Sequence, residues 1–445
     1  MVDELRARCT GPVLTRGDDG FAEEVFAWNT AITHSPDVVV GAATAQDVVE
    51  AVRYARSAGV PVGVQATGHG APRPIKAGVL VSTRRLDTVH IDPQTRIATV
   101  GAGVKWGAVV AAAAEHGLAP ITGSSAGVGA VGYLGGGGLG PLARSHGFSS
   151  DWVRGYRVVT GEGTLVTASA AQNPDLFWAL RGGKTGLGIV TEVQVELAAL
   201  ATLYGGNLTY ATADIESVLR DWVDYTADAP DGVTTSVAIV RMPDLPVLPE
   251  PLRGQTLLTL RFAYPGGEAD GAALAQRFRE VAPVLVDRLG QIPARAIATV
   301  HDDPTEPAPS WVTGAMLSDL DQDFATAVLT RVGPGVNTPL MVVELRHLGG
   351  VTASDVPGGT AVSGRAATHT IGVVALLHPG LEVAVVEAAA RRLLDDVAPW
   401  RSPQGNPNFA NTLASAKEAA MGWPDGVFER LQEVRARYDP SGVFA

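Results

Sequence analysis

Apolar positions in the first 200 residues alternate between helical and extended spacing. Val48, Val52 and Ala55 recur at helical spacing after Thr44 and Asp47, which are placed as in a capping box, and we expect a helix there. Two further helices are predicted over 106–116 and 174–181. Short apolar or alternating runs predict strands over 62–66, 79–81, 98–100, 156–159, 164–167 and 193–197.

The pattern changes after about residue 200. An amphipathic helix is predicted over 214–225, and others over 269–281, 381–397 and 426–437. Strands are expected over 236–240, 256–264, 340–345 and 370–376, and the Pro-rich stretch 302–309 is expected to be an exposed loop. Clustered strands with interspersed helices are typical of an α+β domain with a largely antiparallel sheet.

Composition narrows the class of protein. The chain has 445 residues, of which 46% are hydrophobic, and this length favours roughly two to three domains. Its 46 acidic against 34 basic residues give a net charge of −12, so we expect no nucleic-acid partner. A single cysteine, Cys9, excludes an intramolecular disulfide and a Cys-rich metal site, and we expect no metal. No signal-like or membrane-spanning apolar run is present, which favours a cytoplasmic location.

Two glycine-rich segments, 67–70 and 123–140, are the most unusual stretches of the sequence. Glycine lets a backbone approach a ligand closely and point its N–H groups at an anion, which would let an acidic protein hold a pyrophosphate. Neither segment has the spacing of a P-loop or of a Rossmann fingerprint. Taken alone, each segment fits a turn or a flexible linker equally well.

Taken in order, these motifs resemble a known family. Thr67-Gly68-His69-Gly70, Val128-Gly129, Gly136-Gly-Gly-Leu-Gly140, Asp175-Leu-Phe-Trp178 and Asn408-Phe-Ala-Asn411 are similar to segments of the berberine bridge enzyme-like and 6-hydroxynicotine oxidase-like FAD-linked oxidases. These proteins belong to the vanillyl-alcohol oxidase (p-cresol methylhydroxylase) superfamily. The resemblance spans nearly the whole chain and is strongest over 25–197 and 405–445.

The resemblance implies a two-domain α+β fold. Residues 1–200 and 405–445 would form the FAD-binding domain, and residues 201–404 would form a substrate domain whose antiparallel sheet is flanked by helices. The cofactor-binding residues that it implies are Gln65, Ala66, Thr67, Gly68, His69, Gly70, Thr122, Gly123, Ser125, Val128, Gly129, Gly132, Tyr133, Gly137, Gly138, Gly140, Gly188, Ile189, Val190 and Asn411.

Four of these positions carry specific implications. His69 stands where family members bond an imidazole to the flavin 8α-carbon. Ser125 stands where many relatives have a cysteine that forms a second bond, so a single covalent attachment of FAD through His69 is expected. Val128 resembles the small residue of members that admit oxygen. Tyr133 matches a position near flavin N1, where a phenol would stabilise negative charge.

The substrate side is less specific. Segment 344–350 resembles the strand that crosses over the flavin, and strand alternation puts Glu344 and Arg346 on one face and His347 on the other. The catalytic candidates are therefore Tyr133, Glu344, Arg346 and His347. The usual family bases are missing, because Phe409 replaces a tyrosine and Asp355 comes late for the expected carboxylate. Other candidates, each more typical of a structural role, are His301, Trp311 and His369.

These observations predict an FAD-dependent oxidase. It would oxidise a small organic alcohol or amine and use dioxygen to give hydrogen peroxide, as a monomer or homodimer. The Ala-, Val-, Arg- and Gly-rich composition suggests a bacterial source and a natural-product or catabolic role. Two alternatives stay open at this point: a dehydrogenase with another acceptor, and a flavoprotein that catalyses a net non-redox cyclisation.

Overall fold

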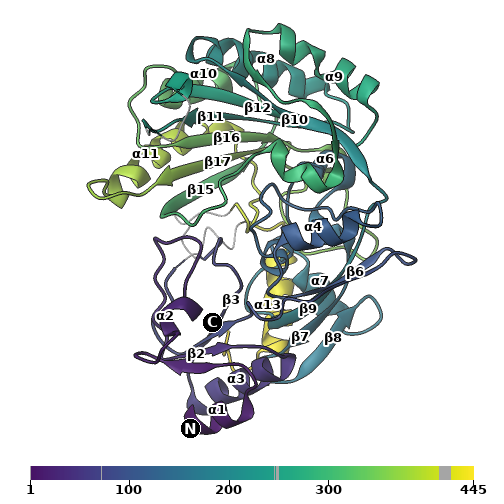
Figure 1. Ribbon diagram of the computed structural model, residues 1–445, viewed down its shortest axis with the longest axis vertical. Helices are drawn as coiled ribbons and strands as arrows, with labels where there is room; N and C mark the ends of the chain where they lie inside the picture. The colour runs from purple at the N-terminus through teal and green to yellow at the C-terminus, as the bar shows by residue number, and fades with distance from the viewer. Residues whose placement is uncertain (1, 72, 245, 247–249, 410–421, 445) are drawn as a thin grey trace.

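The computed structural model describes residues 2–71, 73–244, 246, 250–409 and 422–444. Two bodies are stacked along the long axis of the molecule, and each contains its own sheet or sheets (Figure 1). The N-terminal body holds a four-stranded and a five-stranded sheet, and the other body holds one eight-stranded sheet.

The four-stranded sheet has the order β1-β2-β4-β3, with β1 antiparallel and the other pairs parallel. The elements of this part are α1 (Val2–Arg8), β1 (Val13–Thr15), α2 (Phe21–Glu24), β2 (Val38–Gly41), α3 (Ala45–Ala58), β3 (Val62–Gln65) and β4 (Val79–Ser82). The predicted capping box is confirmed, because Thr44 accepts from the Asp47 amide and Asp47 accepts from the Thr44 amide. The apolar side of α3 is buried, which explains its periodic sequence.

The five-stranded sheet is antiparallel throughout, in the order β5-β6-β9-β7-β8. Its elements are β5 (Val89–Asp92), β6 (Ile97–Gly101), α4 (Trp106–Ala114), α5 (Ala130–Leu134), α6 (Ala143–His146), η1 (Ser149–Trp152), β7 (Val153–Val159), β8 (Leu165–Ser169), α7 (Pro174–Leu180) and β9 (Ile189–Glu196). Two of the predicted strands, 156–159 and 164–167, form the antiparallel hairpin of β7 and β8.

The end of the chain returns to the N-terminal body. Helix α13 (Val427–Tyr438) packs against α7 and buries Leu431 and Val434 in the same apolar cluster as the five-stranded sheet. Beyond it, the Val443 carbonyl accepts from the Val62 amide at the start of β3. Both ends of the chain therefore build one body.

The eight-stranded sheet has the order β13-β10-β12-β11-β16-β17-β15, with β14 also paired to β10, and every pair is antiparallel. Its strands are β10 (Thr202–Tyr210), β11 (Thr234–Arg241), β12 (Thr256–Tyr264), β13 (Val284–Asp287), β14 (Gly290–Pro293), β15 (Ser310–Leu317), β16 (Val342–His347) and β17 (His369–Leu376).

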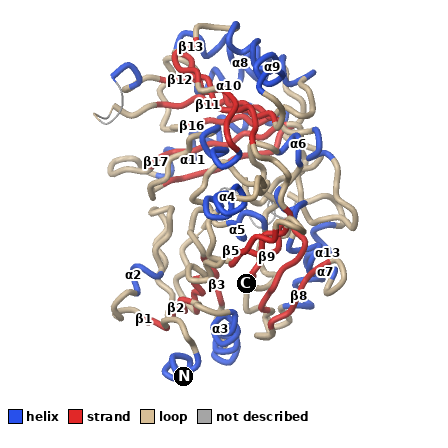
Figure 2. The backbone as a smooth tube through the Cα atoms, turned by 45° about the vertical axis from the view of Figure 1, so that its right-hand side comes forward, coloured by secondary structure: helices blue, strands red, loops and turns tan. Residues whose placement is uncertain are grey.

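Helices cover one face of this sheet and leave the other face toward the N-terminal body (Figures 1 and 2). The helical segments of this part of the chain are η2 (Thr212–Asp214), α8 (Ile215–Asp228), η3 (Glu250–Leu252), α9 (Glu268–Glu280), η4 (Ala294–Val300), α10 (Gln322–Val332), η5 (Gly350–Ala353), α11 (Val383–Asp396) and η6 (Ala398–Trp400). Of these, η4 and η5 pack against α4 and α6 of the N-terminal body. Apolar side chains of α8, α9, α10 and α11 form the largest core cluster with the sheet. The uncovered face is the one that can take part in a site between the bodies.

The fold class predicted from the sequence is confirmed, and the predicted elements agree with the structure to within a few residues. The sequence analysis did not predict several elements, mostly short ones: α1, β1, α2, β2, β5, α5, α6, β10, β13, β14, β15 and α10. Strand β10 contains Gly205 and Gly206, which interrupt the extended pattern. Gly206 has φ 137°, and a side chain there would overlap the carbonyl of Arg288.

Candidate functional site

His69 lies near the beginning of the loop that connects β3 to β4. Its Nδ1 is 2.9 Å from the Thr67 hydroxyl, and the Trp28 indole stacks on the imidazole with centroids 4.3 Å apart and planes 14° apart. Burial, with a smaller contribution from Lys105, lowers the pKa of His69 to about 4. The imidazole is therefore neutral at neutral pH and keeps a lone pair available.

Gly68 brings this loop against the N-terminal segment. It has φ 75°, and a Cβ there would be 2.6 Å from the Cβ of Ala27, so no other residue fits without a shift. Next to it, the Gln65 amide group donates to the backbone carbonyl of Phe26, while its Oε1 is buried without a hydrogen-bond partner. The close approach at Ala27 is what places Trp28 over His69.

The second glycine-rich segment lies against the first. The position that a Cβ would take at Gly127 is 3.7 Å from both the His69 Nε2 and the Ser125 hydroxyl, so both side chains lie beside Gly127. At Gly129 the corresponding position is 3.4 Å from the Cβ of Ala66. We call the two segments, 65–70 and 122–140, the floor.

Tyr133 is enclosed by the floor itself. Its ring lies between Gly123 and Gly138, where a Cβ would touch the ring atoms, and its edge packs on Trp106 with centroids 6.0 Å apart. Burial raises the pKa of Tyr133 to about 12, so the phenol is neutral. Its hydroxyl has no hydrogen-bond partner among the described residues.

Some predicted cofactor glycines serve the chain's own packing. A side chain at Gly140 would overlap the Thr122 carbonyl, and one at Gly137 would meet Phe148 and Val362. By contrast, nothing lies within 4 Å of a Cβ at Gly132, which is exposed. The floor therefore contains glycines that allow close backbone approach and at least one that faces open space.

The third predicted segment begins β9. Gly188 has φ 125°, and Ile189 and Val190 pair with Val159 and Val158 of β7. The Ile189 side chain is buried in the core beside the four-stranded sheet, whereas Val190 is half-buried.

Lys184 and Asn408 bind backbone carbonyls of the floor. The Lys184 ammonium donates to the Gly132 carbonyl at 3.0 Å and to the Asn408 side chain at 2.6 Å, and Asn408 donates to the Tyr133 carbonyl at 2.7 Å. Burial lowers the pKa of Lys184 to about 8. Asn411, predicted as a cofactor ligand, lies outside the described residues.

Glu344 and Arg346 share the uncovered face of β16, as strand alternation predicts. The Arg346 Nε donates to the Glu344 carboxylate at 2.8 Å, and its Nη1 donates to the Leu139 carbonyl of the floor at 3.3 Å. Its guanidinium lies 5.5 Å from the ring centroid of Phe409, which cannot accept a proton. Arg346 thus connects the sheet to the floor.

Arg261 and His301 complete this group, and the sequence analysis did not combine them with it. Arg261, on β12, donates to Glu344 at 2.8 Å, and the His301 Nε2 lies 3.4 Å from the same oxygen. Both His301 ring nitrogens and the Arg261 Nε are buried without hydrogen-bond partners among the described residues. We call Arg261, His301, Glu344 and Arg346 the charged roof cluster.

The charges within this cluster are strongly coupled. Burial by itself would raise the pKa of the Glu344 carboxyl, but the guanidiniums of Arg346 and Arg261 hold that pKa well below its usual value. Burial lowers the pKa of His301, so its imidazole is neutral. The cluster therefore contains one ionised carboxylate, two guanidiniums and one neutral imidazole.

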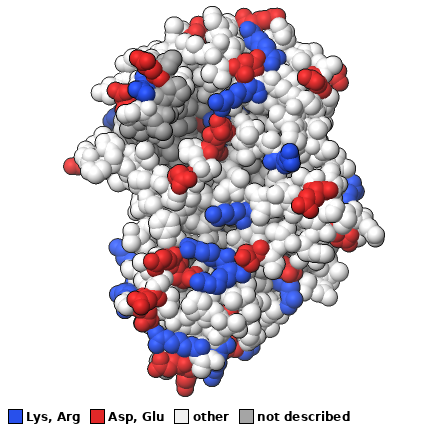
Figure 3. All heavy atoms as spheres, viewed as in Figure 1, with Lys and Arg blue, Asp and Glu red and all other residues white. Residues whose placement is uncertain are grey.

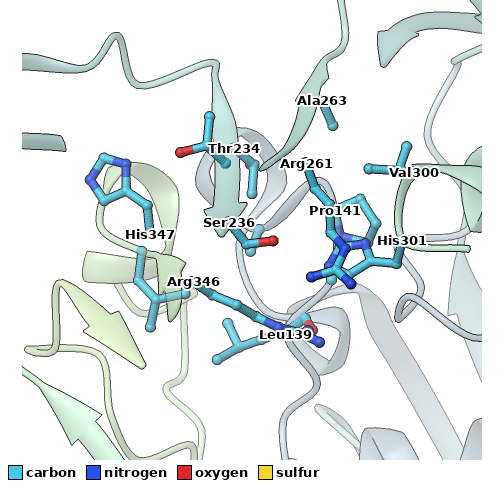
Figure 4. A pocket seen from close by; sticks show the side chains of 14 residues that line it. Leu139, Pro141, Thr234, Ser236, Arg261, Ala263, Val300, His301, Arg346 and His347 are labelled. Carbon is cyan, nitrogen blue, oxygen red and sulfur yellow. The ribbon is translucent and has the colours of Figure 1, made fainter. Parts of the chain in front are cut away.

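A small pocket joins this cluster to the floor (Figure 4). It leaves about 10 Å³ of free volume, roughly the room that one water molecule needs. Its lining comes from both bodies and includes Leu139, Gly140, Pro141, Ser236, Arg261, His301 and Arg346.

His347 also borders the small pocket, but its ring packs away from Glu344 and Arg346. Its ring stacks on His369 with centroids 5.0 Å apart, and its Nε2 is 3.0 Å from the Arg144 guanidinium. Burial lowers the pKa values of His347 and His369 to about 2 and about 3. This pair is packed beside Trp222 of α8, on the covered side of the sheet.

The remaining candidates have structural surroundings. Trp311 is buried in the core cluster of the eight-stranded sheet. Asp355 accepts from the amide and hydroxyl of Thr360 and pairs with Arg365 at 3.0 Å. Among the described residues, no group of three or more His, Cys, Asp or Glu side chains could hold a metal ion.

Comparisons with known proteins agree with this geometry. The family described as "FAD binding domain" matches residues 36–169. (R)-6-hydroxynicotine oxidase of Paenarthrobacter nicotinovorans is 32% identical over 235 residues, 52% of this chain and 51% of that protein. Xylooligosaccharide oxidase of Thermothelomyces thermophilus is 31% identical over 50% of this chain and 46% of its own. The chain thus spans about half the length of the curated relatives it matches.

Solved structures match over the full length. The crystal structure of 6-hydroxy-D-nicotine oxidase from Arthrobacter nicotinovorans has a TM-score of 0.85 at 23% identity and covers 98% of this chain and 96% of its own. The BBE-like 1 protein of Physcomitrella patens has a TM-score of 0.86 at 19% identity, with 100% and 98% covered. The chain has the fold of the FAD-linked oxidases. The family resemblance seen in the sequence is confirmed.

The residues of this FAD-linked oxidase fold suit a flavin dinucleotide. The floor and the adjacent end of β4 present buried polar atoms without partners among the described residues. These atoms are Gln65 Oε1, Ser82 Oγ, Thr122 Oγ1 and the Tyr133 hydroxyl. A buried hydrogen-bonding group without a partner is costly, so a polar ligand that satisfies these atoms is favoured. Gly132 and Gly127 leave room where side chains would intrude.

The surface of this fold gives no sign of a polyanion-binding region on the face shown. Basic and acidic side chains are interspersed there (Figure 3). The described helices include none that is long and apolar enough to cross a membrane.

Proposed function

We propose that the chain is an FAD-dependent oxidase that oxidises a small organic alcohol or amine and uses dioxygen to give hydrogen peroxide. The observation that carries the proposal is the position of His69, a neutral imidazole beside Ser125 and Gly127 within the segment matched by the FAD-binding family. Two similar proteins support the proposal because both are named as oxidases: (R)-6-hydroxynicotine oxidase and xylooligosaccharide oxidase.

The floor would hold the cofactor. Tyr133, Thr122 and Gln65 have buried polar atoms without hydrogen-bond partners among the described residues, and these atoms would bind the cofactor. His69 would hold the cofactor covalently through an imidazole nitrogen. Ser125 carries a hydroxyl in place of a thiol, so His69 would be the single attachment point. When bound, FAD supplies an acceptor for two electrons and passes them to dioxygen.

The charged roof cluster would bind and orient the substrate. A carboxylate whose pKa is held well below its usual value is a poor proton acceptor, so Glu344 fixes the two guanidiniums rather than acting as a base. His301 is neutral, its Nε2 lies 3.4 Å from Glu344, and its Nδ1 is buried without a hydrogen-bond partner among the described residues. His301 is therefore the group in this cluster that can accept a proton from a hydroxyl. An amine that is already neutral needs no such transfer.

We also propose that residues 1–200 and 405–445 form the cofactor domain and residues 201–404 the substrate domain. The change of sheet between β9 and β10 and the packing of α13 on α7 support this division.

Two measurements on the purified protein test the proposed function. Its visible spectrum should show oxidised flavin, and anaerobic mixing with a panel of alcohols and amines should bleach that absorbance with at least one of them. Admission of air should then restore the colour rapidly and release one hydrogen peroxide per flavin. Bleaching followed by slow recovery in air would identify a dehydrogenase, and no bleaching with any compound of the panel would contradict the proposed oxidase.

A further inference from the structure

Trp28 is the residue that fixes the plane of the His69 imidazole. The stacked indole covers one face of the ring at 4.3 Å, and the Thr67 hydroxyl holds Nδ1 at 2.9 Å. The other ring nitrogen, Nε2, is left facing the Gly127 and Ser125 segment. An imidazole held in this way can rotate little about its side-chain bonds.

Trp28 itself is held by the substrate domain. Its indole N–H donates to the Thr305 carbonyl at 3.3 Å, and its own carbonyl accepts from the Ala308 amide at 3.2 Å. The next residue, Asn29, donates to the Ser310 carbonyl at 2.9 Å and accepts from the Ser310 amide at 3.0 Å. Segment 28–30 is thus paired with the Pro-rich loop that leads into β15.

The same tryptophan is also tied to the floor. The Trp28 amide donates to the Thr67 carbonyl at 2.8 Å, and the preceding Ala27 packs on Gly68. One short segment therefore contacts the His69 loop on one side and the substrate domain on the other.

We propose that covalent attachment of FAD at His69 is coupled to docking of the substrate domain through Trp28, which acts as a positioning residue. This inference rests on the proposed function, because it assumes that His69 carries the cofactor. When the 305–310 loop is in place, it holds the Trp28 indole over the His69 imidazole. The Nε2 of His69 then points toward the Gly127 and Ser125 segment. When that pairing is lost, the indole and the imidazole are free to turn.

The attachment step balances with dioxygen as the oxidant. One C–H bond of the flavin 8α-methyl group and the N–H bond of the imidazole break, and one N–C bond forms between His69 and the 8α-carbon. The two protons and two electrons released are taken up by dioxygen as hydrogen peroxide. The substrate domain contributes only geometry to this step.

The test follows the growth of acid-stable flavin after FAD is added to full-length protein prepared without it. Trp28→Leu removes the stacked ring, and we expect attachment to slow by about twofold to tenfold, the range that one aromatic contact provides. Trp28→Phe keeps a ring and should stay closer to wild type. Asn29→Ala should slow attachment as well, although the Asn29 side chain bonds Ser310 and Ala31 and makes no hydrogen bond to His69. Phe26→Ala, at a side chain that is 47% exposed, is the matched control.

A second readout needs no cofactor. The pH titration of the His69 imidazole by NMR, assigned with His69→Gln, should move toward the ordinary value in Trp28→Leu, because the indole contributes to its burial. Wild-type attachment rates in both Trp28→Leu and Asn29→Ala would overturn the inference, and slowing in Trp28→Leu alone would overturn the coupling to the substrate domain. A wild-type protein without any acid-stable flavin would instead refute the covalent attachment within the proposed function.

Discussion

The floor and the charged roof cluster lie on opposite sides of the junction between the two bodies and are held in shape by different forces. The floor consists of two backbone segments that approach each other through glycines, as at Gly129 against Ala66. The roof cluster consists of side chains from β12, β16 and the end of η4, fixed by charge pairing around Glu344. A backbone site depends on local conformation, whereas a charge cluster depends on every partner being present.

The largest expected effect breaks the roof cluster. Glu344→Ala leaves Arg346 and Arg261 buried without their shared carboxylate, and we expect a loss of about 3 kcal/mol in the free energy of unfolding. Substrate-dependent bleaching of the flavin should slow far more than reoxidation. Urea unfolding and stopped-flow absorbance measure the two effects.

A surface ion pair provides the control for that prediction. Glu216 pairs with Arg220 on α8 and is 61% exposed, so Glu216→Ala should cost less than about 1 kcal/mol. Equal losses in the two variants would show that the roof cluster behaves as an exposed ion pair.

The contrast between the floor and the charged roof cluster also explains which site residues could be predicted from the sequence. His69, Ser125, Val128 and Tyr133 lie within two short segments, so a linear motif brings them together. Glu344 and Arg346 were placed on one face because strand alternation is local as well. Arg261 and His301 are 83 and 43 residues from Glu344 in the sequence, and only the pairing of β11 with β12 and β16 brings Arg261 to it. No local pattern carries that information.

His347 shows the limit of the same argument. Alternation predicts that it faces away from Glu344, but not that His369 of β17 and Arg144 of α6 enclose it. Its partner across the strands is set by the register of β16 with β17. The sequence therefore predicts the strand, but it does not predict which residues contact the face of β16 that carries His347.

A smaller effect is expected at the floor. Val128→Leu adds bulk to the floor at the position that resembles the small residue of oxygen-admitting relatives. It should slow reoxidation in air by about tenfold, or about 1.4 kcal/mol of barrier. Anaerobic bleaching should be nearly unchanged, because the roof cluster is untouched. Stopped-flow mixing of reduced protein with aerated buffer gives the rate. The same substitution at Val166 on β8 is the control, and equal slowing there would remove the special role of Val128.

A pH-dependent effect is expected on the covered face of the eight-stranded sheet. Burial lowers the pKa of His347 to about 2 and that of His369 to about 3. Below about pH 6.5 the unfolded chain therefore binds more protons than the folded chain. Stability should therefore fall as the pH is lowered from about 6.5 toward 3. Each histidine contributes up to about 1.4 kcal/mol per pH unit.

His369→Gln should make the free energy of unfolding depend less on pH. Urea unfolding midpoints measured between pH 7 and pH 5 test this, because that window includes the ordinary histidine pKa of about 6.5. The exposed His378, replaced in the same way, serves as the comparison. An unchanged slope in His369→Gln would show that the imidazole is protonated within the fold.

The most direct test of the account maps the flavin to a residue. Protein precipitated with acid should stay yellow, and protease digestion should give one flavin-bearing peptide that contains His69. His69→Ala should release all of its FAD on the same treatment, while Ser125→Ala should release none. A colourless wild-type pellet, or a flavin-bearing peptide that lacks His69, would contradict the assignment of the floor as a single-attachment FAD site.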